Sequence, residues 1–258
     1  MSKLLTALAD GVATVTLNHP ETMNALGPDM AEELRETLGR VAGEARAIVL
    51  TGAGRGFSSG ANLSPSRIDT SAGELDVGAA LDLVYHPLLQ TVRDLPVPLV
   101  TAVNGAAAGI GCSLALMGDI ILAADSAYFL QAFRRIGLVP DGGSTWLLPR
   151  MIGRARAMEM MLLGEKLLAP KALEWGLINR CVADADLLPA AAAMAKELAQ
   201  GPKSLALIRK LAWDGLEAEW RAQLDAERQA QREAGRTADF IEGVSAFLQK
   251  RPARFTGA

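Results

Sequence analysis

Residues 95–119 read LPVPLVTAVNGAAAGIGCSLALMGD, and the rest of the chain is arranged around this stretch. Residues 99–103 are rich in β-branched side chains and lie between a proline and an Asn-Gly pair, which predicts a buried strand. Residues 113–117 predict a helix. The strand feeds the helix through Gly105, Gly109 and Gly111. Such a turn leaves the first helical amides unpaired and accessible, so it predicts either a site for a negatively charged oxygen or a tight turn with a purely structural role.

Two other interpretations of this stretch fail on its residues. It carries no charge before Asp119, but its two prolines, Asn104 and its glycines interrupt any continuous apolar helix of membrane-spanning length. The dinucleotide-binding pattern G-x-G-x-x-G also fails, because Leu114 occupies the place of the third small residue.

Composition limits the class of protein. The 258 residues carry a formal net charge of -3, which gives no reason to expect nucleic acid or an anionic membrane as a partner. Cys112 and Cys181 lie in apolar surroundings and predict free buried thiols in a reducing compartment. With His19 and His86 as the two histidines, no metal site is expected. Asp10 interrupts any apolar signal segment, so a cytoplasmic location is expected.

Strands and helices alternate along the first three quarters of the chain. Strands are expected at residues 12–18, 47–50, 99–103, 120–124, 127–131 and 180–183, and helices at 28–43, 79–94, 155–163 and 170–175. The chain is almost wholly helical from residue 187. This order predicts an α/β core, residues 1–190, with a C-terminal helical region, residues 191–258. The amphipathic tail is expected to cover either its own core or another subunit.

Two short motifs could carry chemistry. Residues 56–60, GFSSG, match the nucleophile-elbow pattern of serine hydrolases, but the residues after them predict no helix, so a flexible loop is the preferred interpretation. Asp141 lies in a Pro-Asp-Gly-Gly turn among apolar residues. It is either a cap for the following helix or a carboxylate whose pKa is raised by desolvation and which acts as a base.

Several segments together resemble the crotonase superfamily, the enoyl-CoA hydratase/isomerase family. They are residues 17–26 (LNHPETMNAL), 56–63 (GFSSGANL), 102–111 (AVNGAAAGIG), 137–146 (GLVPDGGSTW), 172–177 (ALEWGL) and 242–251 (EGVSAFLQKR). The resemblance implies a spiral of β-β-α turns and a C-terminal helical region that makes homotrimers, often paired into hexamers. It also implies a coenzyme A thioester as the substrate, with no separate cofactor.

The family stabilises the enolate oxyanion of the thioester with two backbone amides. Carried over by position, these are the N–H groups of Ala61 and Ile110. The resemblance further implies a set of residues that contact the substrate. Near the coenzyme A moiety these are Met23, Ala25, Asn62 and Leu63, with Phe247 and Lys250 from the tail, their own or a neighbour's.

The acids depart from the family pattern. Where family hydratases carry two glutamates, this sequence has Ser113 and Phe133, so ordinary hydration is not expected. Asp141 remains, in a pattern similar to the isomerase branch that includes the ring-epoxide isomerase of phenylacetyl-CoA degradation. One carboxylate that removes a proton and returns it at another carbon is sufficient to shift a double bond.

Other functions stay open at this point. The same aspartate is the nucleophile of an aryl-CoA dehalogenase in the superfamily, in which case His86 and Phe133 would line a ring pocket. Tyr85, His86 and Phe133 are all expected to contact the substrate. A thioester hydrolase and a coenzyme A-binding subunit without turnover are further alternatives. Phe57, Tyr85, Phe133 and Trp146 suit an aromatic or cyclic acyl group if they line one pocket, and are otherwise ordinary core residues.

Overall fold

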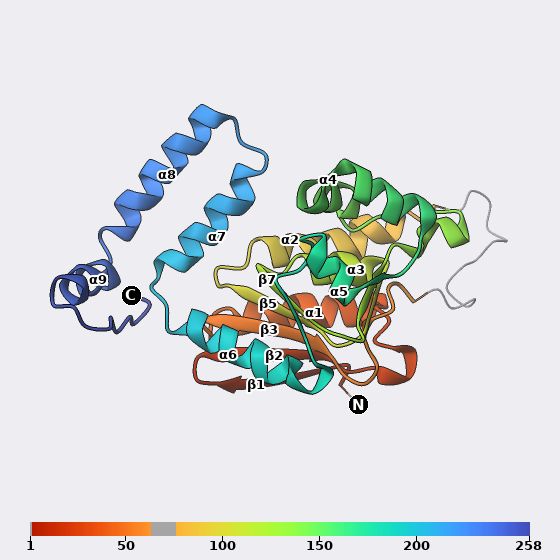
Figure 1. Ribbon diagram of the computed structural model, residues 1–258, viewed down its shortest axis with the longest axis horizontal. Helices are drawn as coiled ribbons and strands as arrows, with labels where there is room; N and C mark the ends of the chain where they lie inside the picture. Colours follow the sequence, from red (N-terminus) through yellow and green to blue (C-terminus); the bar gives the residue numbers. More distant parts are fainter. Residues whose placement is uncertain (1, 63–75) are drawn as a thin grey trace.

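The computed structural model describes residues 2–62 and 76–258, which form two β-sheets covered by helices (Figure 1). In spatial order, the larger sheet contains β1 (Leu4–Ala9), β2 (Val12–Leu17), β3 (Ala47–Gly52), β5 (Leu99–Val103), β7 (Ile120–Ala124) and β10 (Arg180–Val182). The smaller sheet contains β4 (Gly56–Ser58), β6 (Ala106–Ala108), β8 (Tyr128–Leu130) and β9 (Leu167–Leu168).

Successive turns of the chain supply one strand to each sheet. β3, β5 and β7 run parallel in the larger sheet, and β4, β6 and β8, which follow them directly in the chain, run parallel in the smaller one. The chain therefore winds as a spiral of repeated strand–strand turns, which confirms the predicted α/β fold class. The predicted strands at residues 99–103 and 120–124 are confirmed with the same bounds.

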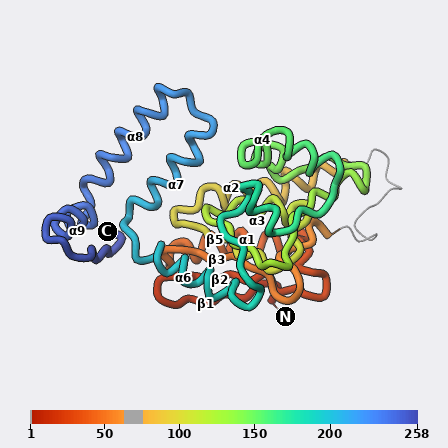
Figure 2. Tube along the Cα trace, in the orientation of Figure 1, coloured from red at the N-terminus to blue at the C-terminus, as the bar shows by residue number. Residues whose placement is uncertain are grey.

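Helices close the two sides of this core. They are α1 (Pro28–Val41), a π-helical segment (Leu81–Tyr85) continuing into α2 (His86–Arg93), α3 (Ile110–Leu116), α4 (Ser144–Leu163), α5 (Ala169–Glu174), α6 (Leu187–Ala199), α7 (Ser204–Gly215), α8 (Trp220–Ala234) and α9 (Ala238–Leu248). α6 packs against β2, β3, β5 and β7. The chain then leaves the core, and α7 to α9 extend to one side (Figure 2).

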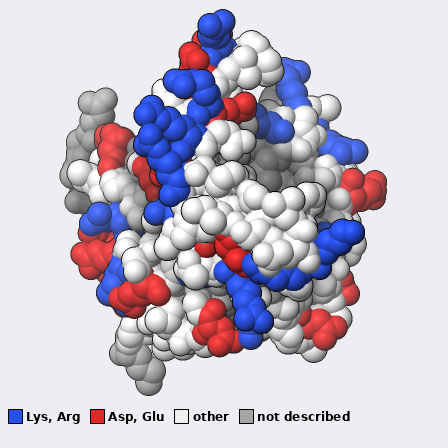
Figure 3. Space-filling view, turned by 90° about the vertical axis from the view of Figure 1, so that its left-hand side faces the viewer, with Lys and Arg blue, Asp and Glu red and all other residues white. Residues whose placement is uncertain are grey.

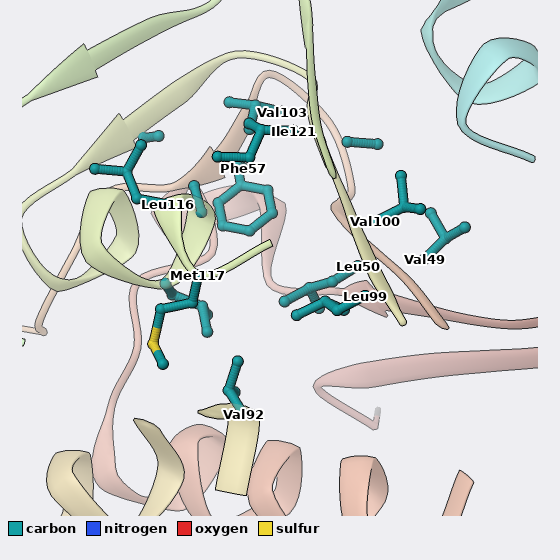
Figure 4. Close-up of a cluster of buried hydrophobic side chains, with 14 of the residues drawn as sticks. Val49, Leu50, Phe57, Val92, Leu99, Val100, Val103, Leu116, Met117 and Ile121 are labelled. Atoms are coloured by element: carbon teal, nitrogen blue, oxygen red, sulfur yellow. The ribbon is translucent and has the colours of Figure 1, made fainter. Parts of the chain in front are cut away.

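The apolar core lies between the larger sheet, the smaller sheet and the helices (Figure 4). Phe57 from β4 is fully buried among residues of both sheets, including Leu50 and Leu99. Burial of each such side chain contributes about 1.5–3 kcal/mol, so this core fixes the strands whose ends carry the site. Among the residues that the structure describes, no helix has both the length and the apolar character needed to cross a membrane.

The tail leaves many large apolar side chains exposed. In residues 204–248 they are Ile208, Leu216, Trp220, Leu224, Phe240, Ile241, Val244, Phe247 and Leu248. Charged side chains surround a broad uncharged area on the side of the molecule where the tail lies (Figure 3). A surface of this kind is typical of an interface with another chain.

One buried cation attaches α7 to the core. Arg209 is almost fully buried, and its Nε lies 2.7 Å from an Asp119 carboxylate oxygen. Its remaining donors bind the carbonyl oxygens of Val92, Arg93 and Leu95 at the end of α2. These carbonyls have no helical partner of their own, so the guanidinium caps α2 and joins it to α7.

Replacing Arg209 with methionine is expected to lower the free energy of unfolding by about 3–5 kcal/mol, because the partly buried Asp119 carboxylate loses its cation and three carbonyl oxygens lose their donor. Urea denaturation followed by circular dichroism measures this loss. The matched control is Lys210→Met, which removes an exposed cation of the same helix paired with Asp214 and is expected to change stability by about 0.5 kcal/mol or less. Equal effects of the two variants would contradict a structural role for Arg209.

Candidate active site

The ends of two neighbouring strands bring two loops together. β4 and β6 pair in parallel, with Gly56 opposite Ala106 and Ser58 opposite Ala107. Just beyond them the backbones of Gly60 and Gly109 touch: a Cβ placed on Gly60 would lie 2.8 Å from the Ala108 carbonyl oxygen. Gly60 also has a φ of +98°, so a side chain is excluded by both space and backbone conformation. Ala61 follows Gly60 and Ile110 follows Gly109, so Ala61 and Ile110 also lie beside each other.

The amides of these two residues have no acceptor in the part of the chain that the structure describes. Within residues 2–62 and 76–258, neither the Ala61 N–H nor the Ile110 N–H donates a hydrogen bond to the protein. Ile110 is the first residue of α3, after Gly109 at the N-cap, and a first-turn amide has no acceptor inside its helix. The partial positive charge of the helix N-terminus adds to the attraction for an oxyanion. These two amides are the pair predicted as the oxyanion hole, and that role stays a prediction.

Asn24 holds the first of these loops in place, and sequence reasoning missed it. Its fully buried side-chain amide donates to the carbonyl oxygens of Ala53 and Gly56, at 3.0 and 2.8 Å. The main-chain carbonyl oxygen of Asn24 accepts from the Ser58 hydroxyl at 2.8 Å. Asn24 has a φ of +56°, and asparagine accepts this left-handed conformation more readily than most residues. The residue type at this position was therefore the signal that the sequence offered.

The same loop carries residues next to the Ala61 amide. Leu26 pairs with Ala61 in a parallel bridge, and its N–H donates to the Gly60 carbonyl at 2.7 Å. Met23 is exposed and Ala25 is half-buried beside this bridge. Because Ser58 is fully buried, it is not placed as an accessible nucleophile, which argues against the serine hydrolase alternative.

The turn that carries Asp141 packs on the first turn of α3. A Cβ on Gly142 would lie 2.3 Å from Ile110 Cδ1 and 2.9 Å from Ser113 Cβ, and Gly142 has a φ of +60°, so glycine is strongly favoured at this position. The Asp141 carbonyl oxygen accepts hydrogen bonds from the Ser113 hydroxyl at 3.1 Å and the Ser144 hydroxyl at 2.6 Å. The turn is thus fixed by its backbone, and the Asp141 side chain is left out of these contacts.

The Asp141 side chain is half-buried, and one of its carboxyl oxygens has no partner in the described part of the chain. The N-cap of α4 is Gly143, and among the described residues the Asp141 carboxyl accepts no hydrogen bond from the first turn of α4, so the capping alternative for Asp141 is wrong. Oxygen Oδ1 of Asp141 is inaccessible and accepts no hydrogen bond within the part of the chain that the structure describes. Burial raises the pKa of Asp141 to about 6, and the nearby positive charge of His86 lowers it in part. A carboxyl with this pKa is well matched to proton transfer near neutral pH.

Ser113 and Phe133 both lie near the start of α3, next to the Asp141 turn or to Gly109. Ser113 lies in α3 and supports the Asp141 turn through its hydroxyl. Phe133 is buried, and its Cζ lies 3.6 Å from the position that a Cβ on Gly109 would occupy. The ring therefore covers the backbone at the start of α3, and neither side chain supplies an acid.

Tyr85 and His86 lie at the start of α2. The Tyr85 hydroxyl is buried and donates to the Leu26 carbonyl at 2.7 Å, which ties α2 to the loop beside Ala61. His86 is exposed, and its Nδ1 lies 3.0 Å from Oδ1 of Asp82. Tyr85 thus acts as an anchor for the site, while His86 influences Asp141 through its charge.

The remaining predicted residues are distributed as follows. Asn62 directly follows Ala61, and Leu63 lies outside the described residues. Phe247 lies at the end of α9 and Lys250 follows just after it, and α9 lies at the opposite side of the molecule from α4 (Figure 1). Within one chain they are not brought to Asp141. Phe57 is buried in the core and Trp146 stacks on Trp213, so the aromatic residues do not line one pocket.

Comparison with known proteins decides the family. The model of the family described as "Enoyl-CoA hydratase/isomerase" matches residues 8–258. The chain belongs to the enoyl-CoA hydratase/isomerase family. Its predicted resemblance to that family is thereby confirmed.

Relatives in the enoyl-CoA hydratase/isomerase family cover nearly the whole chain. A protein of Rhodobacter capsulatus named "Probable enoyl-CoA hydratase" is 49% identical over 97% of this chain and 96% of its own length. The 1,2-epoxyphenylacetyl-CoA isomerase of Escherichia coli is 46% identical over 100% of this chain and 99% of its own length. A crystal structure of enoyl-CoA hydratase from Bacillus anthracis superposes with a TM-score of 0.91 at 30% identity, covering 100% of both chains. Family membership implies action on acyl-CoA thioesters.

Proposed function

We propose that this protein is an acyl-CoA isomerase in which Asp141 transfers the proton and the amides of Ala61 and Ile110 hold the thioester oxygen. The observation that carries the proposal is the Asp141 carboxyl, on a turn packed against Ile110, whose inaccessible oxygen Oδ1 has no hydrogen-bond partner among the described residues. A desolvated carboxylate next to two free amides joins a base to a site for the charge that its action creates.

The reaction needs no group beyond these. The thioester carbonyl oxygen accepts hydrogen bonds from the two amides, and Asp141 removes a proton from a carbon of the acyl chain. The electron pair moves toward the carbonyl and gives an enolate, whose charge the amides stabilise. Asp141 then returns the proton to a different carbon, so the double bond shifts and the composition of the substrate is unchanged.

Isomerisation is preferred over hydration because of the residues around Asp141. Addition of water needs one group to activate the water and another to deliver a proton. Ser113 and Phe133 offer neither, and Ser113 is engaged with the Asp141 turn. The name of the Escherichia coli relative supports a cyclic or ring-epoxide acyl group as the substrate, with a linear enoyl group as the simpler case.

The test is a turnover panel with linear 2-enoyl and 3-enoyl, aryl-acetyl and ring-epoxide thioesters of coenzyme A. Mass spectrometry is expected to show a product of unchanged mass, and NMR is expected to show that its double bond has shifted. A product heavier by one water would establish a hydratase, and release of free coenzyme A or halide would establish a thioester hydrolase or a dehalogenase. Tight binding without any product would leave a non-catalytic binding subunit.

We further propose that coenzyme A lies along Met23, Ala25, Asn62 and Leu63, and that the tail reaches the site of a neighbouring copy. The separation of Phe247 and Lys250 from Asp141 within one chain supports this assignment, as do the exposed apolar side chains of α7 to α9. Residues 191–258 would then form the interface of a homotrimer or of a hexamer built from two trimers. Light scattering measures the mass of the assembly.

The rate of isomerisation is expected to rise with pH and to reach half its maximum at about pH 6, because Asp141 must be deprotonated to accept a proton. Measurement of kcat between about pH 5 and about pH 8 tests this. A second variant, His86→Gln, removes the positive charge that lowers the pKa of Asp141. The midpoint of its pH–rate profile should therefore lie at higher pH than that of the wild type. A midpoint that moved to lower pH would contradict the assignment.

A further inference from the structure

A pair of stacked tryptophans joins the tail to the helix that follows the Asp141 turn. The rings of Trp146 and Trp213 lie nearly parallel, at 8°, with their centroids 6.5 Å apart. Trp146 is in the first turn of α4, and Trp213 is near the end of α7. The guanidinium of Arg150 lies 4.1 Å from the Trp146 ring centroid and restricts that ring further.

Trp213 is itself fixed to the core. Its indole N–H donates to Oδ1 of Asp119 at 3.3 Å, while Oδ2 of the same carboxylate accepts from Arg209. Oδ2 also accepts from the Leu99 amide at 2.8 Å, at the start of β5. The stacked pair therefore connects the central strand of the larger sheet, α7 and α4 at one point.

Main-chain hydrogen bonds connect Trp146 to the turn that carries Asp141. The main-chain N–H of Trp146 donates to the Gly143 carbonyl at 3.0 Å, and the main-chain N–H of Ser144 donates to the Asp141 carbonyl at 3.1 Å. A displacement of the Trp146 ring would move the first turn of α4, and with it the backbone that carries Asp141. Close-packed aromatic rings transmit such a displacement because they cannot be compressed.

We propose that Trp213 is a positioning residue for Asp141 and acts through the ring of Trp146, so that the placement of the tail controls the placement of the base. This rests on the proposed function of Asp141. In α7 one residue, Arg209, is buried, and α8 contains no buried residue. The tail thus has few buried side chains to fix it on the core, and Trp213 lies at a point where α7 meets α4.

The test compares Trp213→Leu and Trp146→Leu with the matched control Trp175→Leu. Trp175 also lies under an arginine of α4, with the Arg156 guanidinium 5.4 Å from its ring centroid. Both test variants are expected to lower kcat by about tenfold with KM changed by less than about twofold, because the base is misplaced while binding is intact. The control should keep kcat, Trp213→Phe should restore most of it, and the double variant should be no slower than either single one.

A second readout does not depend on activity. Hydrogen–deuterium exchange of the amides of residues 144–147 is expected to speed up in Trp213→Leu and not in the control. Unchanged exchange, unchanged kcat in a folded Trp213→Leu protein, or loss of the assembled state together with activity would each overturn the coupling. If the wild-type protein shows no isomerisation at all, the proposed function fails, and the exchange result alone then decides whether Trp213 holds the Asp141 turn.

Discussion

Replacement of Asp141 with asparagine is expected to lower kcat for isomerisation by about 10²–10⁴-fold. The amide has nearly the shape of the carboxyl but cannot accept the substrate proton. The backbone contacts that hold the turn, from the hydroxyls of Ser113 and Ser144, do not involve the side chain and should survive. The measurement is steady-state kinetics on the substrate that the turnover panel identifies.

The control for this variant is Asp184→Asn. Asp184 is an exposed carboxylate that accepts from the hydroxyl and amide of Ser126, and its removal changes the net charge by the same amount. It is expected to leave kcat unchanged. An Asp141→Asn protein that is as fast as the Asp184→Asn protein would contradict the assignment of the base.

The same substitution at Asp141 should make the protein more stable at neutral pH. Because the folded-state pKa of Asp141 is raised, ionisation disfavours the folded state, and stability is lost as pH rises from about 4 to about 6. Asparagine has no such ionisation. Its melting temperature should therefore exceed that of the wild type at about pH 8 and approach it at about pH 4. The base is thus held in the site at a cost in stability.

Much of the fold could be predicted because its strands are long enough to show a pattern. Residues 99–103 and 120–124 are buried, apolar and bounded by turn residues, and the structure has them as β5 and β7. β4 and β6 have three residues each and show no periodicity, so they were expected as loop and turn. β1 was missed because five of its six residues are exposed and it carries little hydrophobic pattern.

The start of α4 could be predicted from its turn, while its full length could not. A helix was expected after the Asp141 turn and another over residues 155–163, whereas the structure has one helix, α4, from Ser144 to Leu163. The helix is kinked at Gly153, where φ is +77° and ψ is 156°. Helical structure continues on both sides of the kink because buried side chains such as Leu147 and Ile152 hold the earlier part against the core.

Asp141 could be selected from the sequence, while the residues that position it could not. Its turn chemistry is local, so a Pro-Asp-Gly-Gly motif carries the signal. Asn24 acts on Ala53 and Gly56, and Trp213 acts on Asp119 and Trp146. Contacts this distant along the chain follow from the packing of the two sheets and the tail, which no local pattern records.

The oxyanion hole can be tested by removing one N–H while keeping the helix. Ile110→Pro is expected to lower kcat by about 10²–10³-fold, since it deletes a donor aimed at the developing charge. Ile110 is the first residue of α3, where proline fits because its missing N–H has no helical acceptor. Gly109 before it has a φ of +52° and a ψ of -129° and carries no Cβ, so the usual restriction on the residue before proline is weak.

Ile110→Ala separates the amide from the side chain. Both variants lose the contact of Cδ1 with the Gly142 turn, but alanine keeps the N–H and should lose less than about tenfold in kcat. The pH midpoint of the proline variant should stay near that of the wild type, because Asp141 keeps its burial and the charge of His86. If Ile110→Pro lowers kcat strongly and leaves the midpoint of the pH–rate profile unchanged, the Ile110 amide belongs to the oxyanion hole and the titrating base is a different group, Asp141. Equal rates in the proline and alanine variants would remove the Ile110 amide from the mechanism.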